Sequence, residues 1–83
     1  MNFHIAAKFE IEKLTYIINF MKSDPKYSNQ TQKLNSAQSS LNSAKSLLDS
    51  IGGAKYLPGQ SEQVWQPIRN AEKIIKEVRR NSK

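Results

Sequence analysis

Hydrophobic residues recur at steps of three and four along a polar stretch in the middle of the chain. Residues 32–53 read QKLNSAQSSLNSAKSLLDSIGG, and Ser, Asn and Gln fill most of this stretch. Its regularly spaced apolar positions are Leu34, Ala37, Leu41, Ala44, Leu48 and Ile51. A heptad pattern of this kind is typical of a helix that buries one face, whereas a disordered segment has no reason to keep it. We therefore predict a buried helical face in spite of the polar composition.

The flanking residues set the boundaries of this helix. Asp24 can accept hydrogen bonds from the first free N–H groups, and Pro25 is tolerated at the first helical position. Gly52 and Gly53 supply the left-handed conformation that closes a helix. The pattern thus predicts one helix over residues 25–51. Its face alternates Leu with Ala, so a neighbouring helix can approach closely.

Two further segments carry the same helical spacing. In residues 2–22 the spaced apolar positions are Ala7, Ile11, Leu14, Ile18 and Met21. In residues 61–80 they are Val64, Ile68, Ala71, Ile75 and Val78. No segment shows the sustained alternation that is typical of strands. We predict an all-α fold, an antiparallel three-helix bundle that forms a single domain over residues 1–83.

Pro67 lies inside the third predicted helix. Proline lacks the N–H that would bond to the carbonyl of Gln63, and its ring kinks a helix. Either the helix begins at Ser61 and bends at Pro67, or it begins at Pro67 and residues 61–66 form a separate turn; we favour the first. Two ion pairs with i,i+4 spacing are expected beyond the proline, namely Glu72–Lys76 and Lys73–Glu77.

The first predicted helix has more apolar surface than two neighbours can easily cover. A second row of large side chains lies away from its core positions: Ile5, Phe9, Tyr16 and Phe20. Exposed aromatic rows mark surfaces that bind a partner or a second copy of the chain. Such a partner helix would complete a four-helix arrangement. The alternative is that the third helix and the 52–60 segment, with Tyr56 and Leu57, cover this row.

The chain is basic, with a net charge of +6 and a pI near 9.8, which favours an anionic partner or surface. In the third predicted helix, four cations spaced by four, three and four residues form one row: Arg69, Lys73, Lys76 and Arg80. Such a row can neutralise several backbone phosphates, or it is simply a solvated face. The predicted helices are long for a helix-turn-helix motif. Nucleic-acid binding through this row is therefore the alternative function.

The sequence offers little for catalysis or metal binding. It has no cysteine, which excludes disulfides and thiolate metal sites. The one histidine, His4, is interpreted as a structural or surface residue, because Glu10 and Glu12 lie on other faces of the same helix. No phosphate-binding loop or nucleophile motif is present. We expect a protein that is not an enzyme and that uses no cofactor and no metal.

The chain also lacks the features of an exported or membrane protein. Its N-terminal residues have no basic segment followed by an apolar run, and no stretch approaches the length of a membrane span. We expect a cytoplasmic protein. Ten lysines against three arginines are typical of AT-rich bacterial and phage genomes.

In length, basic charge and predicted helix content, the chain is similar to bacteriocin immunity proteins and to many small phage inhibitors. This similarity is one of general type, and it assigns no role to any individual residue. We therefore expect a helical protein that binds a macromolecular partner by protein–protein contact, as an inhibitor or immunity-type factor. A homo-oligomer is the other form that such contact can take.

Overall fold

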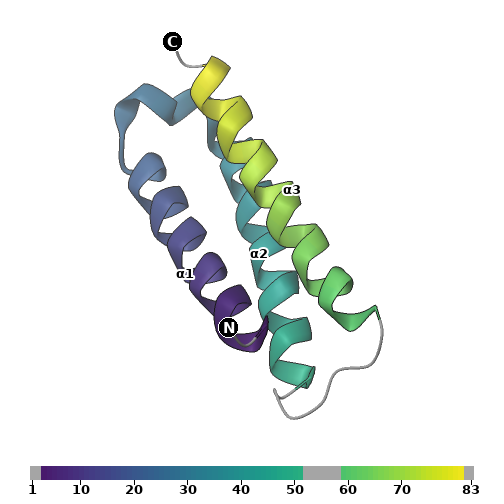
Figure 1. The fold of residues 1–83 in the computed structure, drawn as a ribbon. Coiled ribbons are helices and arrows are strands. Elements are labelled where there is room, and N and C mark those ends of the chain that lie inside the picture. The colour runs from purple at the N-terminus through teal and green to yellow at the C-terminus, as the bar shows by residue number, and fades with distance from the viewer. Residues whose placement is uncertain (1–2, 52–58, 82–83) are drawn as a thin grey trace.

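The protein is an all-α, antiparallel three-helix bundle (Figure 1). The computed structural model describes residues 3–51 and 59–81, and no strand occurs in these ranges. The elements follow in the order α1 (Phe3–Lys22), a short 3-10 helix η1 (Pro25–Gln30), α2 (Thr31–Ile51) and α3 (Gln60–Asn81). The molecule is a rod of 43 × 19 × 18 Å. One end of the rod is formed by η1 together with the C-terminal end of α1, the N-terminal end of α2 and the C-terminal end of α3.

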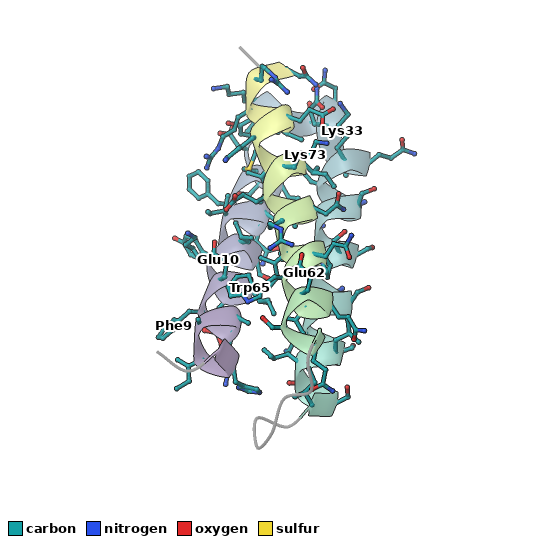
Figure 2. The ribbon with its side chains drawn as sticks, turned by 45° about the vertical axis from the view of Figure 1, so that its right-hand side comes forward. Phe9, Glu10, Lys33, Glu62, Trp65 and Lys73 are labelled. Carbon is teal, nitrogen blue, oxygen red and sulfur yellow. The ribbon has the colours of Figure 1, made fainter. Side chains whose placement is uncertain are left out.

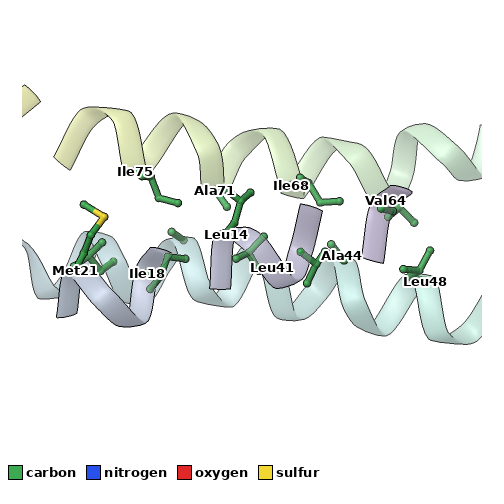
Figure 3. Close-up of a cluster of buried hydrophobic side chains, with 14 of the residues drawn as sticks. Leu14, Ile18, Met21, Leu41, Ala44, Leu48, Val64, Ile68, Ala71 and Ile75 are labelled. Carbon is green, nitrogen blue, oxygen red and sulfur yellow. The ribbon is translucent and has the colours of Figure 1, made fainter. Parts of the chain in front are cut away.

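The core is formed by the apolar face that the sequence pattern predicts on each helix (Figure 3). All fifteen buried residues are apolar, and no polar or charged residue of the described ranges is buried. Of the predicted core positions only Ile51 differs: it is half-buried and packs against the edge of the core. The contact between α2 and α3 is the most extensive and that between α1 and α3 the least. The small residues Ala37, Ala44 and Ala71, all fully buried, lie within the α2 and α3 core faces.

The predicted single helix over residues 25–51 is wrong at its start, because the α-helix begins only at Thr31. Asp24 caps the preceding 3-10 helix as its side chain accepts a hydrogen bond of 3.0 Å from the Lys26 N–H. Tyr27 has φ −106° and ψ 15°, which interrupts regular helical geometry. In this conformation Tyr27 is half-buried and packs against the core. The crossing from α1 to α2 is thus made by the 3-10 helix η1, with Tyr27 packed against the core, and not by a first turn of α2.

The third helix continues through Pro67, and residues 61–66 belong to it, as favoured, instead of forming a separate turn. The bend expected at Pro67 stays a prediction. The helix begins at Gln60, one residue before the predicted Ser61. Gly59 precedes it with φ +92°, a left-handed conformation that suits glycine. The Gly59 carbonyl accepts the first helical hydrogen bond, from the N–H of Gln63 at 3.1 Å.

The exposed serines of α2 provide a test of how little the polar face contributes to stability. Replacing Ser39 or Ser43 by Ala is expected to leave the free energy of unfolding unchanged or to raise it by up to about 0.5 kcal/mol, since Ala is the better helix former. Ser40 is the matched contrast, because its Oγ accepts a hydrogen bond of 2.9 Å from Asn70 Nδ2 on α3. Urea denaturation should give Ser40→Ala a lower free energy of unfolding than Ser39→Ala. The reverse order would show that the hydrogen bond between Ser40 and Asn70 adds nothing to stability.

Candidate functional site

A row of large apolar side chains runs along the outer face of α1, and we refer to these residues as the α1 stripe. Their exposed fractions are 49% at Ile5, 66% at Phe9, 73% at Tyr16 and 62% at Phe20. At about 100° per residue, the stripe points roughly 170° away from the core face of the same helix. Figure 2 shows Phe9 directed away from the bundle. Neither α2 nor α3 covers the stripe, and Tyr56 and Leu57, the other predicted cover, lie outside the described residues.

The α1 stripe is bordered by two shallow hollows. The first, near the start of α1, has a volume of about 330 Å³ and is lined by Ile5, Lys8, Phe9 and Glu12. The second, which we call the tyrosine groove, has a volume of about 270 Å³. Three elements and the α1–η1 turn supply its lining residues: Tyr16, Ile17, Phe20, Met21, Asp24, Tyr27 and Arg79. The stripe is therefore continuous with concave surface at both ends.

Two cations and one carboxylate accompany the aromatic rings of the tyrosine groove. Arg79 comes from the last turns of α3, and its side chain lines the groove. Lys26 Nζ lies 5.5 Å from the centre of the Tyr27 ring, within the range of a cation–π contact. The carboxylate of Asp24 accepts the backbone hydrogen bond that caps η1. The groove thus combines apolar walls with one lining cation, Arg79, and one lining carboxylate, Asp24, while Lys26 lies over the ring of Tyr27.

The four cations predicted to form a row on α3 do share one surface. Together with Glu72 they line a shallow hollow of about 440 Å³: Arg69, Lys73, Lys76 and Arg80. Two of them are already engaged, since Arg69 pairs with Glu62, and Lys76 Nζ lies 3.7 Å from Glu72 Oε1. Among the described residues, Lys73 and Arg80 have no acidic side chain within ion-pair distance. The row therefore offers two unpaired cations, not four.

One of the two predicted ion pairs along α3 is wrong. The structure has the Glu72–Lys76 pair, but Glu77 pairs with Lys33 of α2 at 3.4 Å instead of with Lys73. The physical reason is the close approach of α2 and α3, which brings the start of α2 beside the close of α3. Such a contact between helices cannot be read from spacing within one helix.

His4 lies in a different place, a groove of about 550 Å³ between α1 and α2. It is half-buried there, opposite polar residues of α2 that include Gln38, Asn42 and Asp49. Gln38 donates a hydrogen bond of 3.0 Å to Asn42, while its own buried Oε1 accepts none.

No group of three His, Asp or Glu residues with metal-binding geometry occurs in the described part of the chain. Within the same part, no helix is sufficiently long and apolar to span a bilayer.

Sequence reasoning missed two residues that the fold brings to the α1 stripe, Tyr27 and Arg79. Tyr27 had a signal, because it lies seven residues before Leu34 and so continues the heptad spacing of α2. Arg79 had none, since its position beside α1 depends on how α3 packs. The predicted stripe residues themselves lie together as expected.

Comparison with protein-family models, with curated proteins and with solved structures gave no match to this chain.

Proposed function

We propose that this protein is a non-enzymatic binding protein that attaches to a macromolecular partner, a protein, through the α1 stripe. The observation that carries the proposal is the exposure of three aromatic side chains and Ile5 on the outer face of one helix. Monomeric proteins rarely leave a contiguous apolar surface of this kind in water unless something binds there.

The area of the stripe is consistent with a protein interface. A fully buried aromatic side chain covers about 150–250 Å², so three that are roughly two-thirds exposed leave about 300–500 Å² to be covered. A standard interface takes about 800 Å² from each partner. Further contact area is supplied by Ile5, by the two bordering hollows and by the aliphatic stem of Lys8. The stripe can therefore form the centre of an interface of ordinary size.

An inhibitor or immunity-type role is the form of this function that we favour. It follows from the similarity of type, in size, charge and helical content, to bacteriocin immunity proteins and small phage inhibitors. A chain of this size acts by covering a surface of its target, here in the cytoplasm of a bacterial or phage-infected cell. The partner is then a protein of that cell or a second copy of the chain.

Affinity capture from the native host tests the proposal. Tagged wild type and the Phe9→Glu/Tyr16→Glu variant are used in parallel, and bound proteins are quantified by mass spectrometry. We expect at least one protein to be retained by the wild type and lost with the variant. Ser39→Glu/Ser43→Glu, which adds the same charge to the exposed face of α2, is the matched control and should retain it. Equal retention by all three forms would remove the α1 stripe from the function.

The second candidate function is nucleic-acid binding through the basic row of α3, favoured by the alignment of its four cations on one surface. We expect no specific complex at physiological salt, because two of those cations are engaged by Glu62 and Glu72. An electrophoretic mobility-shift titration with DNA and RNA measures this. A complex of micromolar or tighter affinity that weakens steeply with salt would promote this function above the first. Changing all four cations to Gln should then abolish the complex and leave the fold intact.

A further inference from the structure

Positive charge is concentrated at one end of the bundle. That end contains seven basic residues: Lys22, Lys26, Lys33, Lys73, Lys76, Arg79 and Arg80. Only three acidic residues lie among them: Asp24, Glu72 and Glu77. The rest of the described chain is balanced, with four basic and four acidic residues: Lys8, Lys13, Lys45 and Arg69 against Glu10, Glu12, Asp49 and Glu62. The net charge of the described residues, +4, therefore lies at the end where α1 closes and α2 begins.

The tyrosine groove opens at this same basic end. Its aromatic walls include Tyr16 and Phe20, so it continues the α1 stripe directly. Arg79 is the cation that lines it, and Lys26 lies next to it, over the ring of Tyr27. The stripe itself extends about 22 Å along α1, or four helical turns. A partner that lies along the stripe thus meets a near-neutral apolar surface at one end and a positive one at the other.

This arrangement fits a nucleic acid poorly. A strand that stacks bases on aromatic rings needs positive charge along the whole row of rings to neutralise its backbone. Here Lys8 and Glu12 line the same hollow beside the stripe, so that their charges offset each other, and Lys13 is paired with Glu10 at 3.1 Å. Asp24 lines the groove as well. A protein partner can place carboxylates at the basic end alone, which a uniformly charged strand cannot do.

A second copy of the chain also fits poorly. Antiparallel pairing that sets Phe9 opposite Tyr16 places the basic end of each copy against the near-neutral end of the other, which offers it no net opposite charge. Parallel pairing sets two basic ends side by side. Like charges placed opposite each other across an interface suppress association. Charge complementarity therefore favours a partner that has a different sequence and carries negative charge.

We propose that the α1 stripe and the tyrosine groove bind an acidic amphipathic helix, whose apolar face lies on the stripe and whose carboxylates lie against Lys26 and Arg79. This inference rests on the proposed function, since it names the chemistry of the partner at the same surface. An amphipathic helix suits the surface because its apolar residues, at intervals of three and four, follow a stripe of four turns. Electrostatic attraction of the carboxylates of this helix is strongest at the basic end, where the Asp24 carboxylate is already engaged in capping η1.

A peptide-display selection tests the inference. A library of amphipathic helical peptides with randomised polar positions is selected on the wild type and depleted on the Phe9→Glu/Tyr16→Glu variant. Fluorescence anisotropy then measures the affinity of the surviving peptides for the wild type, for Lys26→Glu/Arg79→Glu and for Lys45→Glu/Arg69→Glu. The last variant is the matched control, because it reverses two exposed cations away from the basic end. Circular dichroism verifies that each variant keeps its helix content.

We expect surviving peptides with a net negative charge, whose affinity falls at least about 10-fold with Lys26→Glu/Arg79→Glu and less than about 2-fold with the control. Neutral or basic survivors, or acidic ones that bind both charge variants equally, would overturn the inference and leave the proposed function standing. If no peptide distinguishes the wild type from the Phe9→Glu/Tyr16→Glu variant, the proposed function fails too. Co-sedimentation with phosphatidylglycerol vesicles, in the absence of acidic survivors, would assign the surface to a lipid membrane and overturn the inference.

Discussion

Replacing Leu41 by Ala is expected to lower the free energy of unfolding by about 2–5 kcal/mol. Leu41 lies at the centre of α2 and is fully buried, in the core that all three helices share (Figure 3). Removing most of its side chain takes away apolar contact and leaves a cavity that helices of fixed spacing cannot fully close. Chemical denaturation followed by circular dichroism measures the loss.

Leu47 provides the matched control for this prediction. It carries the same side chain on the same helix, but it lies off the heptad pattern and is 38% exposed. Leu47→Ala is therefore expected to cost clearly less than Leu41→Ala. A denaturation midpoint that is unchanged by Leu41→Ala, or shifted equally by both, would contradict the bundle core described here.

The second large effect is expected on binding. Phe9→Glu with Tyr16→Glu should weaken attachment of the partner at least 100-fold and leave the helix content of the free protein unchanged. Both side chains are more than half exposed and lie opposite the core, so the folded chain does not depend on their burial. At an interface, aromatic residues near the centre are the ones whose loss costs most, commonly 2 kcal/mol or more each.

Sedimentation equilibrium and circular dichroism on the wild type and the double variant separate the outcomes. A wild type that associates with itself, and a variant that does not, would identify a second copy as the partner. That result would overturn the acidic-helix inference while keeping the stripe as the binding surface. A monomeric wild type together with an unfolded variant would show that the stripe belongs to the core, and the proposed function would then be wrong.

The core was predictable because burial on one face of a helix leaves a period in the sequence. Leu34, Leu41 and Leu48 mark that period even among serines and asparagines, and all three are buried. The same reasoning placed the α1 stripe on a second face of its helix, but it left open whether the third helix and residues 52–60 cover that face.

What the sequence did not reveal depends on contacts between elements. The break at Tyr27 arises where the chain crosses from one helix to the next, and there side-chain packing overrides the helical tendency of the residues that follow Pro25. The pairing of Glu77 with Lys33 and the position of Arg79 beside α1 are set by the packing of α3. No spacing within a single segment encodes these two contacts of α3.

The central claim, that the partner binds on the outer face of α1, is tested most directly by NMR with isotopically labelled protein and the purified partner. We predict that the largest chemical-shift changes fall on Ile5, Phe9, Tyr16 and Phe20, with smaller changes around the tyrosine groove. Changes centred on Arg69, Lys73, Lys76 and Arg80 of α3, with α1 unperturbed, would contradict it.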